Sequence, residues 1–215
     1  MTGPRPDLAV ARYRKLAAGY DASATRTMPL RRRAIGLLKL RPGDTVLDAA
    51  CGTGLSFPLI QETIGPSGRL VGVELSPDMM RLARERVAQA GWTNVTLIEA
   101  PMEKAAVPFP LDAILLNYTH DVLRSPLALL RIFRDAKPGA RVAAAGMKLF
   151  PWWLAPLNLY ALAKARPYMT TFEGLARPWD LLAKYVPGLK VSATQLGMGY
   201  IAHGTCPGAI RRYQK

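Results

Sequence analysis

The stretch VLDAACGTG, at residues 46–54, decides the fold. An apolar run ends in Asp48, and Gly52 and Gly54 follow on either side of a threonine. A short apolar run bounded by turn residues predicts a buried strand, and the glycines predict a tight turn into a helix. Ligands of open parallel sheets bind beyond the carboxyl ends of the strands. The stretch therefore predicts a strand, a ligand-binding loop and a helix.

The rest of the chain repeats this alternation of strand and helix. Helices are predicted over residues 8–20, 29–39, 55–64, 77–90 and 126–136. Strands are predicted over residues 45–50, 69–75, 94–100, 111–118, 140–146, 189–196 and 199–204. Strands that alternate with helices indicate an α/β fold, with a parallel sheet that helices cover on both faces.

The charge of the chain is strongly basic and unevenly distributed. The 215 residues fit one domain and carry 29 Lys or Arg against 15 Asp or Glu, a formal net charge of +14. Residues 1–41 hold ten of the bases against only Asp7 and Asp21, which gives this segment a charge of +8. Such an arm favours an anionic partner, which could be nucleic acid, an anionic membrane surface or an acidic substrate. A solvated helix face would carry the same charges.

Cysteine usage and hydropathy place the chain in the cytoplasm, either free or resting on a membrane. Cys51 and Cys206 are far apart and lack metal-ligand spacing, so neither a metal site nor a disulfide framework is expected. The N-terminus lacks the apolar core of a signal peptide, and no run of about 18 apolar residues predicts a membrane span.

Three positions limit which ligands the first loop could bind. Phe57 occupies the place where a dinucleotide fingerprint has its third glycine, and no Walker lysine follows the loop, so NAD and ATP are disfavoured. Glu74 ends the second predicted strand, where an acid accepts hydrogen bonds from ribose hydroxyls. The carboxylate of Asp48 suits a ligand with positive charge and would repel a pyrophosphate.

Three segments together resemble the class I S-adenosylmethionine-dependent methyltransferases over about residues 40–147. They are VLDAACGTG (46–54), GVELSPDMMRLARERV (72–87) and LRIFRDAKPGARVAAAG (130–146). GPSGRLVGVELSPDMM (65–80) and GYDASA (19–24) resemble the small-molecule branch that includes quinone and phospholipid methyltransferases. The resemblance implies a Rossmann-like, seven-stranded and mostly parallel sheet with helices on both faces and an antiparallel last strand. It also implies S-adenosylmethionine as cofactor and S-adenosylhomocysteine as product.

The resemblance assigns the cofactor to one set of residues: Tyr20, Asp48, Ala50, Gly52, Thr53, Gly54, Glu74, Leu75, Met102 and Asn117. In this assignment the first loop cradles the methionine half, Glu74 holds the ribose hydroxyls, and Leu75 packs on the adenine. Tyr20 closes over the cofactor, while Asn117 and Tyr118 face the methyl group. The family usually has an acid near position 101 for the adenine amino group, but this chain has Pro101. Glu99, Glu103 or the backbone around Met102 could replace it.

The chemistry implied by the resemblance is an in-line displacement of a methyl group from sulfur, in which the protein supplies alignment and excludes water. A phenol or ammonium acceptor must also lose a proton. His120 and Tyr118 are the catalytic candidates because they follow the fourth strand, and His203 is a weaker one. A loop histidine that caps the next helix is the alternative for His120.

The segments divide into four predicted parts. Residues 1–41 form a basic helical lid, 42–149 the cofactor-binding core, 150–187 an inserted acceptor lid, and 188–215 the strands that complete the sheet. The insertion is rich in aromatic residues, and its prolines favour shaped loops over a simple helix. Trp152, Trp153, Tyr168 and His203 are the predicted substrate contacts.

The predicted function is methyl transfer to a small apolar, aromatic or lipid-like acceptor through N, O or S, with a contact to an anionic membrane as a further partner. An RNA methyltransferase that uses the basic arm is the alternative. A Pro-Pro-aromatic run for holding a flipped base is absent after Asn117, which disfavours RNA. A non-catalytic module that binds the cofactor or a membrane is the third possibility.

Overall fold

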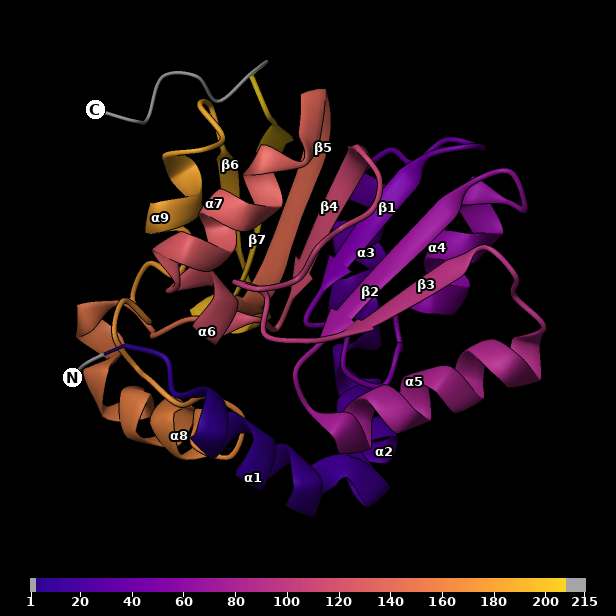
Figure 1. The fold of residues 1–215 in the computed structure, drawn as a ribbon. Coiled ribbons are helices and arrows are strands. Elements are labelled where there is room, and N and C mark those ends of the chain that lie inside the picture. The colour runs from indigo at the N-terminus through magenta and orange to yellow at the C-terminus, as the bar shows by residue number, and fades with distance from the viewer. Residues whose placement is uncertain (1–2, 208–215) are drawn as a thin grey trace.

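A seven-stranded sheet in the order β3-β2-β1-β4-β5-β7-β6 organises the chain (Figure 1). The computed structural model describes residues 3–207. The strands are β1 (Thr45–Ala49), β2 (Arg69–Glu74), β3 (Val95–Glu99), β4 (Leu111–Asn117), β5 (Ala136–Met147), β6 (Lys190–Thr194) and β7 (Gly199–Thr205). Strands β1 to β5 pair in parallel, and β7 is antiparallel to both of its neighbours. The predicted fold class, including the antiparallel last strand, is confirmed.

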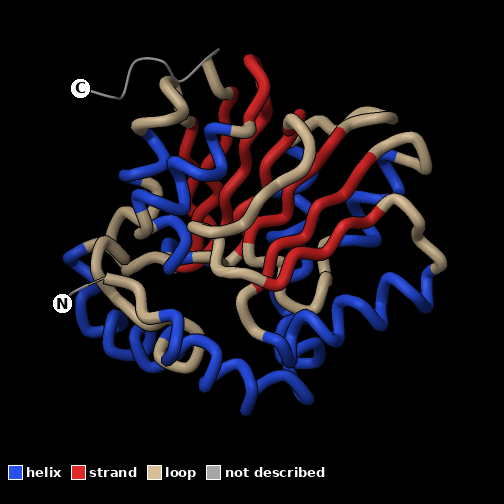
Figure 2. The backbone as a smooth tube through the Cα atoms, viewed as in Figure 1, coloured by secondary structure: helices blue, strands red, loops and turns tan. Residues whose placement is uncertain are grey.

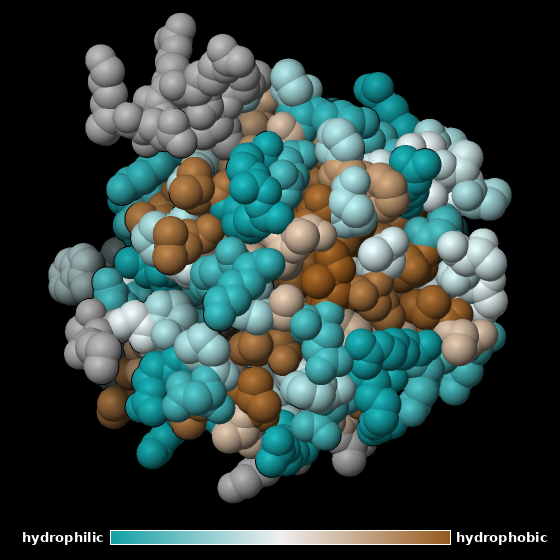
Figure 3. All heavy atoms as spheres, viewed as in Figure 1, coloured by the Kyte–Doolittle hydropathy of each residue, from teal (hydrophilic) through white to brown (hydrophobic). Residues whose placement is uncertain are grey.

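Helices cover both faces of this sheet (Figure 2). The α-helices are α1 (Pro6–Leu16), α2 (Tyr20–Ala24), α3 (Met28–Leu37), α4 (Phe57–Ile64), α5 (Pro77–Ala90), α6 (His120–Leu123), α7 (Pro126–Arg134), α8 (Ala155–Ala165) and α9 (Asp180–Ala183). Short 3-10 turns are η1 (Ala17–Gly19), η2 (Thr25–Thr27), η3 (Trp152–Leu154) and η4 (Gln195–Gly197). Helices α3, α4 and α5 pack on one face, and α6, α7 and α9 pack on the other. Figure 3 shows hydrophobic side chains gathered over the half-buried strand β3 and the loop that follows it.

Phe57 explains why the first loop contains Gly54. The ring of Phe57 is fully buried at the start of α4, and a Cβ on Gly54 would lie 2.6 Å from it. A Cβ on Gly72 in β2 would lie 2.9 Å from the same ring. Gly54 therefore leaves room for a core side chain as well as forming the predicted turn. The large residue at the third fingerprint position is accommodated by these two glycines.

Predicted boundaries are wrong at the end of α1 and between α7 and β5. The helix predicted over residues 8–20 ends at Leu16, and Tyr20 begins the separate helix α2 after the turn η1. The helix predicted to continue to residue 136 ends at Arg134, and β5 begins at Ala136 instead of residue 140. Pro138 is tolerated in β5 because the register with β4 shifts between Leu111 and Ala113, so no ladder bond requires its missing N–H.

The insertion and the last strands also differ in part from the prediction. Residues 150–187 contain the regular helix α8, where we had expected shaped loops. His203 lies inside β7, within the strand predicted over residues 199–204. Residues 208–215 of the predicted C-terminal segment lie outside the described residues. Helices α1 and α8 lie together beyond the carboxyl ends of the parallel strands (Figure 1). Among residues 3–207, every helix is too short or too polar to cross a membrane.

Candidate active site

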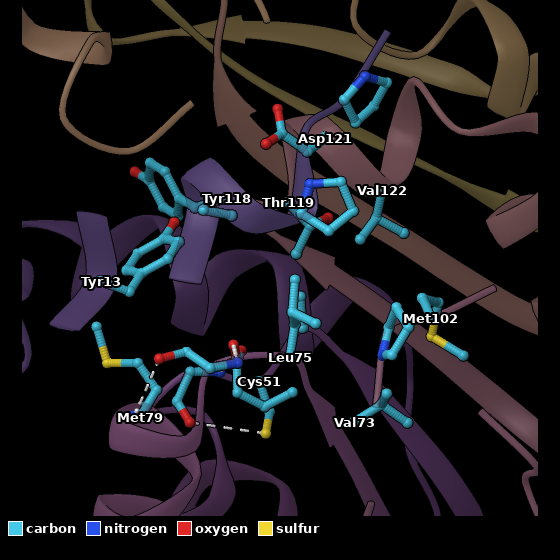
Figure 4. Close-up of a pocket in the computed structure, with 18 of the residues that line it drawn as sticks. Tyr13, Cys51, Val73, Leu75, Met79, Met102, Tyr118, Thr119, Asp121 and Val122 are labelled. Carbon is cyan, nitrogen blue, oxygen red and sulfur yellow. Dashed lines mark hydrogen bonds between the residues drawn. The ribbon is translucent and has the colours of Figure 1, made fainter. Parts of the chain in front are cut away.

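A cavity of about 970 Å³, including its open mouth, lies at the carboxyl ends of β1, β2 and β4. Its floor comes from the residues that follow these strands, and α1 forms its roof. Figure 4 shows Tyr13 and Tyr118 on one side of this cavity and the apolar side chains of Val73, Met102 and Val122 on the other. The cavity therefore has an aromatic wall and an aliphatic wall, both beyond the strand ends where a parallel sheet binds ligands.

The backbone is strained where the chain leaves β1 and β4. Ala50 has a φ of 53° and Tyr118 a φ of 59°, although both carry a Cβ. Each residue comes directly after its strand, the two strands are neighbours, and both residues line the cavity. The left-handed region costs a non-glycine residue about 1 kcal/mol or more. Strain of this kind at adjacent strand ends is typical of a functional site.

Glu74 joins the first loop to the end of β2. Its Oε2 accepts a hydrogen bond from the N–H of Gly52 at 2.9 Å, and its Oε1 accepts one from the N–H of Ser76 at 2.8 Å. Burial raises the pKa of Glu74, and the two N–H donors oppose this. Each oxygen keeps a further lone pair that can accept from a ligand hydroxyl. Gly52 has a φ of 60°, so a residue with a side chain would be strained at this junction.

Three polar side chains at the end of β4 and directly after it have buried atoms without partners within residues 3–207. Both amide atoms of Asn117, Oγ1 of Thr119 and Nδ1 of His120 are buried without a hydrogen bond, and all three residues line the cavity. Buried polar atoms without a partner cost about 1–3 kcal/mol each, so native structures rarely keep several together unless a ligand or water satisfies them. The cluster therefore indicates a polar ligand at the end of β4.

His120 has a defined proton position. Its Nε2 lies 3.0 Å from the carbonyl oxygen of Glu173, which can only accept, so the proton of the neutral ring is on Nε2. Nδ1 is then a free acceptor. Burial lowers the pKa of His120 below 6.5, which keeps the ring neutral at pH 7. The expectation that His120 only caps a helix is therefore not what the contacts show, because its ring binds the backbone of the insertion.

The aromatic wall that contains Tyr118 continues through three further tyrosines, Tyr13 on α1, Tyr20 on α2 and Tyr168. The ring centroids of Tyr13 and Tyr20 are 6.2 Å apart, those of Tyr20 and Tyr168 are 6.4 Å apart, and both pairs meet edge to face. The hydroxyl of Tyr13 donates to the carbonyl of Tyr168 at 3.1 Å. Burial raises the pKa of Tyr13 and of Tyr20, so both remain phenols at neutral pH. The aromatic wall thus joins the N-terminal helices to the insertion.

Arg31 is a site residue that the sequence analysis missed. Its neighbours Arg32 and Arg33 are exposed, but Arg31 is buried and lines the cavity. Its Nε donates to Thr27 at 3.0 Å, its Nη1 donates to Ser56 at 3.3 Å, and its guanidinium lies 5.4 Å from the centroid of Tyr118. Arg31 was not distinguished from the two arginines that follow it, because a run of three arginines does not show which side chain faces the sheet.

Asp48 lies behind the cavity wall rather than on it. It is buried on the side of β1 that faces α3 and α4, because side chains alternate along a strand. Its Oδ2 has no partner within residues 3–207, and burial raises its pKa to about 7, while the charge of Arg31 opposes the rise. A buried carboxyl without full compensation is positioned to act on a cation by charge and not by direct contact.

Helix α2 is fastened to the first loop through Asp21. This carboxylate accepts from the hydroxyl of Thr53 and pairs with Arg86 of α5. Arg86 also donates to the carbonyl of Thr53 at 2.8 Å. Thr53 therefore serves as an anchor for α2 and lies outside the cavity wall.

Most of the predicted site residues meet at the cavity. On its wall are Tyr20, Ala50, Gly52, Glu74, Leu75, Met102, Asn117, Tyr118, His120 and Tyr168. Outside its wall are Asp48, Thr53, Gly54, Trp152, Trp153 and His203. His203 lies along β7 opposite Ala143, away from the strand ends, and the two tryptophans are exposed on η3.

The neighbourhood of Pro101 offers one acid to the cavity. Glu103 lines the wall, and its Oε1 accepts from the hydroxyl of Ser125 at 2.6 Å. Glu99 instead pairs with Arg84 at 3.0 Å. Among the expected substitutes for the adenine-binding acid, the wall thus contains Glu103 and Met102 but not Glu99.

Comparison with known proteins assigns the chain to a family. A family model described as "Methyltransferase domain" matches residues 40–170. The chain belongs to the class I S-adenosylmethionine-dependent methyltransferases. It is 31% identical over 138 residues to the demethylmenaquinone methyltransferase of Symbiobacterium thermophilum, a match that covers 60% of this chain and 55% of that one.

Two further similarities agree with this family. The chain is 28% identical over 127 residues to the malonyl-[acyl-carrier protein] O-methyltransferase of Serratia marcescens, covering 59% of this chain and 48% of the relative. It thus spans only about half the length of these two curated relatives. The crystal structure of a SAM-dependent methyltransferase from Aquifex aeolicus is 21% identical, with a TM-score of 0.56 over 82% of this chain and 89% of that one. At that identity the structural likeness supports the fold alone.

The methyltransferase assignment agrees with the chemistry of the cavity. The family uses S-adenosylmethionine, whose ribose hydroxyls, ammonium and carboxylate need polar partners. The unpaired atoms of Asn117 and Thr119 and the free lone pairs of Glu74 provide such partners at neighbouring strand ends. The residues present therefore fit this cofactor.

Proposed function

We propose that this methyltransferase modifies a small apolar, aromatic or lipid-like acceptor that binds under α1 beside the cofactor. The observation that carries the proposal is that one continuous cavity joins both halves. It runs from Glu74 and Leu75, through Asn117, to Val10 and Tyr168 under the roof. An acceptor under that roof would meet mainly aliphatic and phenol surfaces, which suit an apolar molecule with few polar groups.

In this proposal the polar half holds the cofactor. Glu74 accepts from the ribose hydroxyls, Leu75 and Met102 flank the adenine, and the N–H groups around Gly52 approach the methionine half. Tyr20 covers the site, and a Cβ on Gly52 would lie 3.9 Å from its ring. When bound, S-adenosylmethionine supplies a methyl group on a positively charged sulfur, which is a good leaving group. The protein then contributes alignment and exclusion of water.

His120 is the proposed base for acceptors that carry a proton on the attacking atom. Its Nδ1 is unpaired, its ring is neutral at pH 7, and the carbonyl of Glu173 holds the tautomer. Tyr118, at the strained end of β4, is proposed to position the acceptor, because its pKa is raised by burial and its hydroxyl therefore stays protonated.

The relatives suggest which acceptors to test first. One relative is named for demethylmenaquinone and another for malonyl-[acyl-carrier protein]. A screen with radiolabelled S-adenosylmethionine should compare a quinol, a long-chain amine, a thiol, an acyl thioester and RNA. We expect label in at least one of the apolar small molecules and none in RNA. Label only in RNA, with steep salt dependence, would support the alternative that the net charge of +14 favours.

Binding without any transfer would support the non-catalytic alternative. A calorimetric titration with S-adenosylmethionine, together with the label screen, separates these cases, because a binding module and an enzyme both give heat but only an enzyme gives product. Failure of the cofactor to bind would contradict the proposed assignment of the cavity.

A further inference from the structure

Helix α8 exposes apolar side chains that nothing in the described chain covers. Its residues are hydrophobic on almost every face, a composition typical of a helix that is buried all round. The inner face does pack, since Ala161 and Ala165 are buried and Asn158 exchanges hydrogen bonds with the backbone of Phe150. The outer face, however, remains in contact with solvent.

The exposed face is formed by η3, α8 and η4, and we name it the tryptophan face. Its members are Trp152, Trp153, Leu157, Leu159, Tyr160 and Leu196. The exposed fractions of the side chains are 84% for Trp152, 75% for Leu159 and 96% for Leu196. A cluster of large apolar side chains exposed to this degree marks an interaction surface, whereas single exposed leucines are ordinary.

Leu196 is held on this face by a strained turn. Its φ is 56° and that of Gln195 is 50°, both in the left-handed region. The turn lies against the start of the insertion, because a Cβ on the next residue, Gly197, would lie 3.7 Å from Pro151. A left-handed backbone costs free energy at a leucine, and a fully exposed side chain gains no burial to offset it. Burial against a partner would supply that missing stabilisation.

Helical spacing divides the outer face of α8 into two stripes that both end in a base. Trp153, Leu157, Tyr160 and Lys164 follow each other at intervals of three and four residues, as do Leu159, Ala163 and Arg166. The Nζ of Lys164 lies 5.6 Å from the centroid of Tyr160. Basic residues at one end of an apolar helix face can extend to the lipid headgroups while the apolar part enters the membrane.

The charge around this face selects an anionic partner. Residues 136–172 contain no Asp or Glu, and within this range Lys148, Lys164 and Arg166 flank the exposed side chains. The neighbouring helix α1 carries three bases against Asp7, a charge of +2. A second copy of this chain would bring the same positive charge to the contact, so self-association is disfavoured.

We propose that the tryptophan face docks on an anionic phospholipid bilayer as an interfacial surface, with α8 lying along the headgroup boundary. Tryptophan and tyrosine favour this boundary because they combine an apolar ring with a polar tip. The contact is peripheral, because α8 has only 11 residues. Tyr168 links the two surfaces, since it follows α8 and lines the cavity. A docked molecule would therefore hold its acceptor cavity close to the bilayer.

Flotation with vesicles tests this proposal independently of methyl transfer. The full chain is mixed with vesicles of phosphatidylcholine alone or with phosphatidylglycerol added. We expect binding to the anionic vesicles, a shift of tryptophan emission to shorter wavelength, and weaker binding as salt rises. Absence of binding to the anionic vesicles at low salt would overturn the proposal, whatever the outcome of the activity screen.

Matched variants show whether the tryptophan face itself makes the contact. Leu159→Ser and the double variant Trp152→Ser, Trp153→Ser should reduce the vesicle partition coefficient at least tenfold. Leu127→Ser, on α7 and 66% exposed, is the control and should bind as the wild type does. Lys164→Glu should weaken binding about fivefold or more. Equal binding by Leu159→Ser and Leu127→Ser would overturn the proposal.

Sedimentation of the same variants tests the other possible partner of the tryptophan face, a second copy of this chain. A dimer that the double tryptophan variant abolishes, together with wild-type protein that ignores anionic vesicles, would assign the face to self-association and contradict docking on lipid. Circular dichroism confirms folding, which we expect to persist because these side chains are exposed.

Discussion

The buried carboxyl of Asp48 allows the effect of one charge on the stability of the protein to be measured. Burial raises its pKa from an ordinary value of 3.8 to about 7, and its Oδ2 has no partner in the described chain. At about 1.4 kcal/mol for each pH unit, the ionised form costs the cofactor-free protein about 4 kcal/mol of stability. The substitution Asp48→Asn keeps the shape of the side chain and removes the charge.

The direction of the pH dependence follows from the two pKa values. The unfolded chain ionises this carboxyl above about pH 4, whereas the folded protein keeps it protonated up to about pH 7. Unfolding in that window releases a proton, so the free energy of unfolding falls as pH rises and levels off above about pH 7. Between pH 5 and pH 8 the expected loss from Asp48 is about 3 kcal/mol.

Urea unfolding of wild type and Asp48→Asn at pH 5 and pH 8 tests this expectation. The variant should gain about 3 kcal/mol relative to the wild type between the two pH values, or about 10 °C in Tm. Glu74 also has a raised pKa, and its charge contributes to the raised pKa of Asp48, so the difference between the two proteins includes this coupling. A difference between the proteins that is the same at both pH values would refute the reasoning.

The same variant should lose affinity for the cofactor while it gains stability. At pH 8 the ionised carboxylate attracts the positive sulfur and ammonium groups from behind the cavity wall, so Asp48→Asn should weaken S-adenosylmethionine at least about tenfold in a calorimetric titration. Affinity that matches the wild type at pH 8 would show that the charge of Asp48 does not reach the cofactor.

Three further predictions address the loop, the ribose contact and the base. Glu74→Gln should weaken S-adenosylmethionine by about tenfold or more because it loses a charged acceptor, whereas Glu99→Gln, its paired neighbour on β3, should bind normally in the same titration. Gly54→Ala should destabilise the fold by about 2–4 kcal/mol in urea unfolding through strain and contact with Phe57, and Gly43→Ala, where φ is 87° but a Cβ would meet only Oγ of Ser67, at 3.9 Å, should lose only about 1 kcal/mol. With a phenol acceptor, kcat should fall below about pH 6.5, because the lowered pKa of His120 places its protonation there, and His120→Gln should lose at least about a hundredfold in kcat and the pH step with it. A pH step that survives in His120→Gln would assign the base to another group.

The sequence by itself determined the sheet and which strand-end residues meet at the cavity. The alternation of apolar runs with capped helices is local information, and Ser76 and Gly91 bound α5 as their residue types predict. The carboxyl ends of parallel strands share one edge, so Ala50, Glu74 and Asn117 could be brought together from strand positions alone.

Only the tertiary structure decided which side chains face the cavity. Arg31 is buried and Arg32 is exposed because the packing of α3 on the sheet fixes the rotation of that helix, which a run of three arginines does not specify. Asp48 lies behind the wall because the pleat of β1 turns it toward α3 and α4. Trp152 and His203 lie away from the cavity for the same reason: chain order places a residue near a site, but the packing of its element decides where the side chain points.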